Sequence, residues 1–330
     1  MGQNNKKTIS FVIASVFILM IGVILASVVG VAHVNIGTIW DSIFNYSEVL
    51  ELMLIRDVRI PRVLSVLMTG GILGITGAMI QGVTRNPIAE PSLLGVSQGA
   101  TLVIAVFYAM GIAINTKSVM MASLIGAVLS SIIVINFITG RTKNNSVTKI
   151  LLAGTSMSTF FISLTTIIGL LSNRSQLVAF WVAGGFRNAT WSDFKLVFIV
   201  GVVGTTIAMV LSQKINILSL GDDVAISLGE NPQRIRLVVF LLMIPMCAAA
   251  VAVGKNIGFV GLIVPQIIKK IVGEDYKKVI PLSFLLGAIL LTYSDIAARM
   301  IYSPYETPIG IFTALIGVPF FIVMARKEKG

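Results

Sequence analysis

Long apolar runs recur along almost the whole chain and are separated by short polar segments. A membrane-spanning helix needs about 20 mostly apolar residues, within a range of roughly 17 to 25. By this criterion the pattern predicts nine full spans and one short one, and therefore an all-α integral membrane protein with about ten transmembrane helices. The predicted spans cover 9–32, 57–83, 93–112, 118–139, 147–171, 193–213, 235–254, 259–272 (the short one), 280–300 and 307–325.

The segments between the spans are too short to form a soluble domain, so we expect residues 1–330 to form a single transmembrane domain. The first apolar run is longer than the roughly 7–15 residues of a signal-peptide core, which favours a retained anchor. Residues 172–192 contain an apolar run too short to cross the membrane. We interpret this segment as an outer interfacial or re-entrant helix, with Trp181 and Trp191 at headgroup depth.

Composition and charge agree with this interpretation. Hydrophobic residues make up 56% of the chain and charged residues 12%, against roughly 25% charged in a typical soluble domain. The net charge of +11 could suggest nucleic acid, but the basic residues form short clusters between spans instead of one patch, so we expect no such partner. Most of the 25 Lys and Arg residues fall on the cytoplasmic side if both termini are placed there.

Several kinds of chemistry are excluded by the residues that are present. Cys247 and His33 are the only cysteine and histidine, so neither an internal disulfide nor a Cys/His metal cluster is possible. The chain contains no G-x-x-x-x-G-K-[ST] loop for ATP, no nucleophile elbow and no paired-carboxylate site. We therefore expect a protein that is not an enzyme, with no catalytic residues, no metal site and no cofactor of its own.

The second span carries a stripe of small residues. Gly70, Gly74, Ala78 and Gly82 recur every four positions, so one face of this helix lacks bulk and predicts close approach of a neighbouring helix.

The fifth span carries hydroxyl side chains at helical spacing. Thr155, Thr159, Ser163 and Thr166 could line a wet pathway across the membrane, or could bond back to their own helix and to its neighbours. The residues alone leave both interpretations open.

Asp295 and Arg299 are four residues apart on the ninth span and can therefore pair on one helix face. An acid within a span is a functional hypothesis by default, because ion-coupled carriers use such groups. Arg299 lies at the outer end, so Asp295 is shallow and pairing is the favoured role. The other acidic residues within the predicted bounds, Asp57 and Asp193, stand at the first position of their spans and none lies in a span interior, which argues against a buried proton relay.

Two cytoplasmic segments have unusual turn chemistry. In the turn after the second span, Asn86-Pro87 and Glu90-Pro91 disfavour helix, which indicates either a stiff connector or a gate. Between the sixth and seventh spans, Asp222 is a plausible N-cap and Gly229 suits a helix end. Val224, Ala225 and Leu228 form an apolar stripe there, and Asn231-Pro232 predicts the start of the next helix. This segment is either an ordinary connector or a helix that docks on a cytoplasmic partner.

These residues resemble a known family, the FecCD-type permease subunits of ABC importers for ferric siderophores, haem and vitamin B12. The likeness covers nearly the whole chain in the right order. The motifs that carry it are Arg59-Ile60-Pro61-Arg62, Gln81 to Ala100, Ile150 to Gly154, Ser227-Leu228-Gly229, Gly258 to Pro265 and Thr307 to Phe321.

The resemblance implies the type II ABC importer permease fold in the cytoplasmic membrane of a bacterium. It implies a second permease subunit, for which a paralogue is favoured over an identical copy. It also implies two ATPase subunits that carry ATP and Mg, and an extracytoplasmic siderophore-binding protein.

The resemblance also assigns roles to residues. It implies docking of the binding protein on Arg59, Arg62 and Arg299. It implies a cytoplasmic gate around Asn86, Ile88, Val147 and Thr148. It makes the 219–230 loop the element coupled to the ATPase, through Asp222, Asp223, Ala225, Leu228 and Gly229. The chain departs from the family pattern at Gln266, where many relatives have histidine.

We therefore expect the membrane-spanning subunit of an ATP-driven importer that moves ferric siderophore by alternating access. Haem or vitamin B12 is the alternative substrate within the family. Two alternatives from other classes are an ion-coupled secondary carrier that uses Asp295 and a purely structural membrane scaffold.

Overall fold

The computed structural model describes residues 2–30, 36–45, 47–112, 115–139 and 147–327, and this part of the chain contains helices and no strand. Ten of its helices correspond to the ten predicted spans, which agrees with the predicted count. Six of the helices are long and apolar enough to cross a membrane by length and composition. The ten are α1 (Gly2–Val28), α4 (Ile60–Thr84), α5 (Val96–Ala109), α6 (Thr116–Thr139), α7 (Val147–Leu171), α9 (Trp191–Ser219), α11 (Pro232–Gly254), α12 (Val260–Val272), α13 (Tyr276–Met300) and α14 (Ile309–Lys327).

Shorter helices occupy the connections. They are α2 (Ile36–Phe44), α3 (Leu50–Met53), the π-helical segment η1 (Leu54–Arg59), the 3₁₀ segment η2 (Pro91–Leu94), α8 (Ser175–Ala183) and α10 (Asp222–Ser227). Helices α3, η1 and α4 follow one another without a break and form 35 residues of continuous helix. The helix that contains the predicted second span therefore begins at Leu50, seven residues before the predicted span, because the polar residues Arg56 and Asp57 interrupt the apolar run without interrupting the helix.

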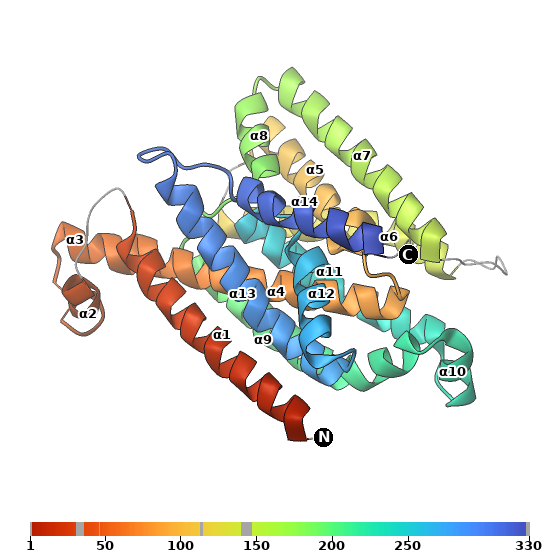
Figure 1. Ribbon diagram of the computed structural model, residues 1–330. Helices are drawn as coiled ribbons and strands as arrows, with labels where there is room; N and C mark the ends of the chain where they lie inside the picture. The colour runs from red at the N-terminus through yellow and green to blue at the C-terminus, as the bar shows by residue number, and fades with distance from the viewer. Residues whose placement is uncertain (1, 31–35, 46, 113–114, 140–146, 328–330) are drawn as a thin grey trace.

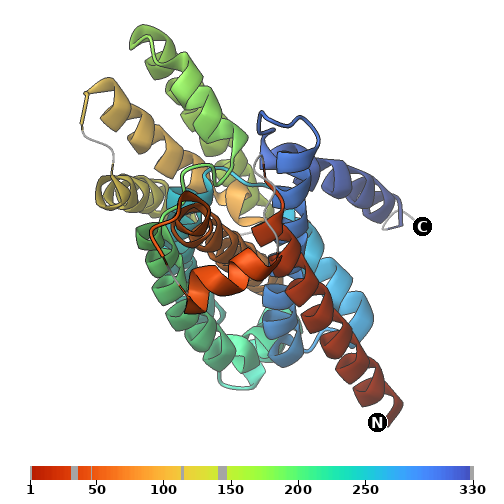
Figure 2. The ribbon, with the colours of Figure 1, turned by 90° about the vertical axis from the view of Figure 1, so that its left-hand side faces the viewer.

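Helix α4 lies at the centre of the molecule, with α9, α11, α12 and α13 packed around it (Figures 1 and 2). In its most apolar window 83% of the residues are buried, against 17% in α1 at the edge. The predicted close packing of the glycine stripe is confirmed. A Cβ atom at Gly70 would overlap the carbonyl of Gly287, and one at Gly74 would overlap the carbonyl of Ser283, so the backbones of α4 and α13 touch.

Helix α12 is only half as long as its neighbours. Its 13 residues extend about 20 Å, and it begins beside the middle of α4, where Gly261 lies against Gly77. The chain that leaves α4 bends back to the same level, because a Cβ atom at Gly261 would lie 3.1 Å from Pro91. The turn at 85–95 is therefore packed into the helix bundle, whereas the sequence pattern indicated only a connector or a gate.

Helix α8 confirms a short helix within 172–192. The structure differs from the predicted setting of Trp181, whose ring is buried in the protein and whose indole NH donates to the hydroxyl of Tyr108 at 3.1 Å. Trp191 begins α9 and donates its indole NH to the backbone carbonyl of Arg56 at 3.0 Å. Because the Tyr108 hydroxyl accepts the indole NH of Trp181 inside the protein, this ring can be buried there and does not need a hydrogen-bond partner at the membrane surface.

The two ends of the molecule differ in their connections. In Figure 1 the start of α1, the end of α14 and α10 lie toward the right-hand side, whereas α2 and α3 lie at the left. We call the end that carries α10 the inner end and the end that carries α2 and α3 the outer end. Both described chain ends therefore lie at the inner end.

Candidate functional site

A cluster of charges joins α4, α13 and the connection after α13 at the outer end. Arg62 of α4 contacts Asp295 of α13 at 2.8 Å and Glu306 at 2.6 Å, and Arg299 contacts Asp295 at 2.9 Å. The side chain of Asp295 is only 1% exposed. The predicted pairing of Asp295 with Arg299 is confirmed, and the structure adds Arg62 as a second cation on the same carboxylate.

Two arginines of this region bind the last turn of α1. Arg59 donates to the carbonyls of Ser27 and Val28 at 3.0 and 2.7 Å. Arg299 donates to the carbonyls of Ala26 and Val29 at 2.9 and 2.8 Å. These carbonyls belong to the helix end that has no partners within the helix, so the guanidinium groups cap α1 and complement its dipole.

The arginines assigned to docking are therefore directed into the helix bundle. Arg59, Arg62 and Arg299 are each less than 10% exposed, and their partners belong to this chain. Their docking role stays a prediction. The neighbouring Arg56 is exposed. Sequence reasoning missed the capping of α1, because a carbonyl at a helix end leaves no signal in the side-chain pattern.

The turn after α4, which contains the predicted gate residues Asn86 and Ile88, is tied to the start of α12. Asn86 accepts a hydrogen bond from the backbone NH of Ile88 at 3.0 Å, which fixes the turn locally. The carboxylate of Glu90 accepts from the backbone NH of Phe259 at 2.6 Å. Phe259 precedes the first residue of α12, so this carboxylate also lies at the positive end of that helix.

Two glutamines complete the connection between this turn and α12. Gln266 donates to the side-chain oxygen of Gln81 at 2.7 Å and to the carbonyl of Pro87 at 3.2 Å. Gln81 donates to the carbonyls of Gly261 and Leu262. Gln266 therefore acts here as a neutral hydrogen-bond donor. The other predicted gate residues, Val147 and Thr148, begin α7, and their side chains lie outside the described residues.

The half-buried carboxyl of Glu90 has a raised pKa. The turn lies between helices, and desolvation raises the pKa of the Glu90 carboxyl to about 7, although the hydrogen bond from the Phe259 NH acts in the opposite direction. The contact between the turn and α12 therefore contains a group that changes charge near neutral pH.

Helix α10 is held at its base and exposed at its edge. Asp222 accepts from Arg236 of α11 at 2.7 and 3.0 Å and lies 3.4 Å from Arg85. The predicted N-cap role of Asp222 was wrong. Gly221, with φ of 132°, is the N-cap, and the carboxylate of Asp222 is engaged by Arg236.

The remaining residues of this segment lie as follows. Ala225 is fully buried, Asp223 is exposed, and Val224, Ile226 and Leu228 are 39%, 61% and 60% exposed. Gly229 has a φ of 80°, which suits the predicted end of the helix. Asn231 accepts from the backbone NH of Arg234 at 3.1 Å and caps α11, as predicted. The inner end therefore carries a short, rigidly seated helix with an exposed apolar edge.

The hydroxyl face of α7 is open. Thr159, Ser163 and Thr166 are exposed and Thr155 is half-buried, and each hydroxyl donates to a carbonyl one turn earlier in α7. Bonding back to the helix, one of the two interpretations left open by the sequence, is thus observed. The same groups lie on a surface that the described chain does not cover, so their role in lining a pathway stays a prediction.

Comparison with known proteins defines the class. The fold matches that of a putative metal-chelate type ABC transporter in an inward-facing conformation, with a TM-score of 0.83, 26% identity, and coverage of 96% of this chain and 99% of that chain. A weaker likeness, with a TM-score of 0.58 and 17% identity, relates the fold to PsaBC from Streptococcus pneumoniae. The chain is a multi-pass membrane permease of the ABC transporter type.

The chain belongs to the FecCD transport family, whose model matches residues 18–327. The iron(3+)-hydroxamate import permease FhuB of Bacillus subtilis is 38% identical, over 96% of this chain and 83% of that protein. The Fe(3+)-citrate permease YfmD of the same organism is 36% identical, over 99% and 97%. The hemin permease HmuU of Yersinia pestis is 31% identical, over 95% of each.

Proposed function

We propose that this chain is the membrane-spanning subunit of an ATP-driven importer for a ferric siderophore. The exposed apolar edge of α10 carries the proposal for an ATP-driven system. A helix seated by the Asp222–Arg236 pair and presenting Val224, Ile226 and Leu228 has the form of a helix that fills a groove on a partner. The family gives the class of that partner, an ATPase that binds ATP and Mg, two copies of which would serve one importer.

The mechanism that follows is alternating access. ATP-driven movement of the ATPases would be transmitted through α10 to α11, because Asp222 is bonded to Arg236 on that helix. Arg236 also donates to the carbonyl of Val83 near the end of α4, so the same movement reaches the start of the gate turn. The inner end would face the cytoplasm, with both termini on that side.

The open face of α7 supports a second permease as the other wall of the pathway, and we favour a paralogue over an identical copy. Loaded binding protein would dock at the outer end, where Arg59, Arg62 and Arg299 remain the proposed docking residues. Since these side chains are buried, docking through them would require the charge cluster to open.

The substrate assignment comes from the relatives. Hydroxamate and citrate complexes of iron are the cargo in the names of two of them, and hemin in the name of a third. Haem is therefore the second candidate. Uptake by an ion-coupled carrier is disfavoured because Asp295 is engaged by two arginines.

Affinity purification from native membranes tests the proposal. We expect an ATPase and a second permease to be recovered with this chain, and cells lacking the chain to lose uptake of ⁵⁵Fe-siderophore. Recovery of the chain alone after crosslinking, with uptake abolished by collapse of the proton gradient, would contradict it.

A further inference from the structure

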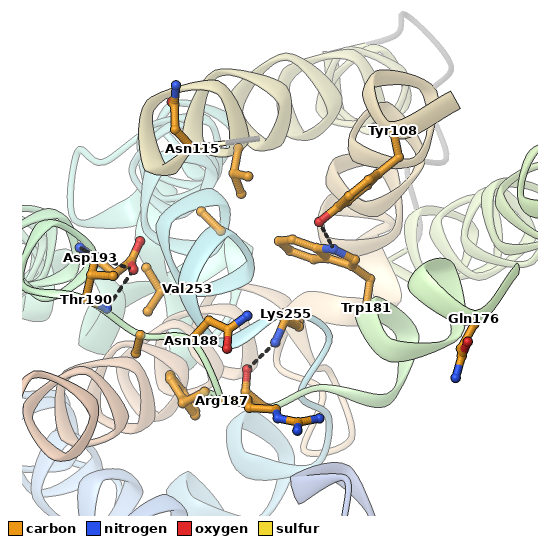
Figure 3. Close-up of a pocket in the computed structure, with 15 residues that line it drawn as sticks. Tyr108, Asn115, Gln176, Trp181, Arg187, Asn188, Thr190, Asp193, Val253 and Lys255 are labelled. Carbon is orange, nitrogen blue, oxygen red and sulfur yellow. Dashed lines mark hydrogen bonds between the residues drawn. The ribbon is translucent and has the colours of Figure 1, made fainter. Parts of the chain in front are cut away.

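A cavity of about 810 Å³ opens at the outer end, between α5, α6, α9 and α11 and beside α8 (Figure 3). Its volume falls in the range of roughly 300–1,000 Å³ that is usual for small-molecule sites. Among the described residues, those that line the cavity come from neither α7 nor α14. The residues of this one chain therefore form its lining, away from the hydroxyl face of α7.

One wall of the cavity is aromatic and fixed. The indole NH of Trp181 donates to the hydroxyl of Tyr108, and the two ring centroids are 6.3 Å apart. Figure 3 shows the two side chains pointing toward each other, with Lys255 and Asn188 on a neighbouring wall. Trp181 is only 7% exposed and its NH is already bonded, so it offers a ligand the small apolar part of its ring that remains open to the cavity.

The other walls carry positive charge. The ammonium group of Lys255 donates to the carbonyl of Gly185 at 2.8 Å and lies 5.7 Å from the Trp181 ring centroid. Arg187 lines the cavity with an exposed side chain, for which no bonding partner is found among the described residues.

The acidic residue of the cavity, Asp193, is already engaged. Its carboxylate accepts from the backbone NH and the hydroxyl of Thr190 at 2.8 and 2.7 Å, as part of the cap of α9. Arg187 and Lys255 carry two positive charges and Asp193 carries one negative charge, so the net charge of these lining residues is positive. The amide side chain of Asn188 lies beside Lys255 and supplies a further hydrogen-bond donor, whereas those of Asn115 and Gln176, also on the lining, are directed away from it (Figure 3).

We propose that this cavity is an outer binding site for an anionic iron chelate, one whose iron-binding groups are carboxylates or catecholates. Arg187 and Lys255 would attract and hold the negative charge. The amide of Asn188 would donate to the chelate oxygens, and Trp181 would pack against the flat apolar part of the chelate. The assignment rests on the proposed function for the class of cargo. It predicts discrimination by charge within a single permease subunit, before the pathway between two subunits is reached.

The test is a binding titration on the full chain in lipid nanodiscs. Trp40 and Trp191 are replaced by phenylalanine so that Trp181 alone reports, and quenching is followed with ferric citrate and with a neutral ferric trihydroxamate. We expect ferric citrate to bind at least ten times more tightly than the neutral complex. In the double variant Arg187→Gln/Lys255→Gln, the affinity for ferric citrate should fall by about the same factor of ten. Lys195→Gln, which removes one positive charge at an exposed position outside the cavity, should leave binding unchanged and is compared with each single variant, Arg187→Gln and Lys255→Gln.

Equilibrium dialysis of ⁵⁵Fe-citrate against the otherwise unaltered chain gives a second readout that does not depend on the tryptophan substitutions. Absence of binding at millimolar citrate, or equal affinity in the double variant, would overturn the site while leaving ATPase co-purification intact. Loss of binding-protein capture in the double variant with citrate binding unchanged would make the cavity a protein-docking pocket instead. If the proposed function were wrong but the site correct, the chain would still bind ferric citrate but no ATPase would co-purify with it.

Discussion

Removing the charge of Asp295 tests whether the outer charge cluster holds the helix bundle together. In the Asp295→Asn variant, Arg62 and Arg299 both lose the carboxylate that lies 2.8 and 2.9 Å away. Breaking a buried ion pair by removing one partner costs about 3–5 kcal/mol, because the other charge stays buried without compensation. Arg62 keeps Glu306 at 2.6 Å, so we expect the lower end of this range, about 3 kcal/mol.

The assay is unfolding by SDS in mixed micelles, followed by the loss of helical circular dichroism. Asp57→Asn is the matched control, since Asp57 is exposed near the same end of the molecule, and we expect a change within about 0.5 kcal/mol for it. In a double-mutant cycle, Asp295→Leu and Arg299→Met should show a coupling energy of about 2 kcal/mol. An Asp295→Asn chain that unfolds at the same SDS fraction as the wild type would refute the reasoning.

The same variants separate a structural role from a docking role. If Arg62 and Arg299 only bound the outer partner protein, their replacement by methionine would abolish capture of that protein without changing the unfolding transition. The geometry predicts loss of stability in both variants, with loss of capture as a consequence.

Three further predictions concern other parts of the molecule. Gly77→Ala should destabilise the chain by about 1–3 kcal/mol, because the added methyl group overlaps Gly261, whereas Gly258→Ala, which meets open space, should be neutral in the same SDS titration. Leu228→Asp should abolish co-purification of the ATPase without lowering the thermal unfolding temperature, since this side chain is 60% exposed; retained co-purification would contradict the role of α10. Burial lowers the pKa of Lys255 to about 8, with Arg62 and Arg187 acting in the same direction and Glu306 and Asp193 against it. The unfolded chain then binds more protons than the folded one above pH 8, so from pH 8 to 10 the wild type should gain stability relative to Lys255→Met, as measured by SDS unfolding at each pH.

The spans could be predicted because the bilayer imposes one length and one polarity on each of them. The short span at 259–272 was also visible, and α12 matches it within one residue at its start. Hydropathy did not show that α12 starts beside the middle of α4, because the hydropathy of a short apolar run does not depend on its depth in the membrane. The depth depends on Gly77 and Gly261 meeting, and these two residues are far apart in the sequence.

In the candidate site, only the features that depend on residues close together in the sequence could be predicted. Asn231 caps α11 and Pro232 is its first residue, both local effects, and Asp295 and Arg299 pair because they share a helix face. The sequence does not show whether an arginine near the outer end of a span faces a partner protein or the helix bundle. Arg62 faces the bundle because it pairs with Asp295, which lies 233 residues away in the sequence, so its direction depends on tertiary packing.

The capping of α1 has a consequence for how the protein is made. Helix α1 is synthesised before the other described helices, but Arg299, which binds its last turn, follows 273 residues after the carbonyl that it contacts. At roughly 5–20 residues per second, synthesis of that stretch lasts on the order of tens of seconds. During this interval α1 remains in the bilayer without Arg299, held by its own apolar surface and by Arg59, which follows Val28 after 31 residues. A nascent chain that ends before α13 therefore carries α1 with only the contacts of Arg59 at its last turn, and this part of the outer end is completed only once α13 has been made.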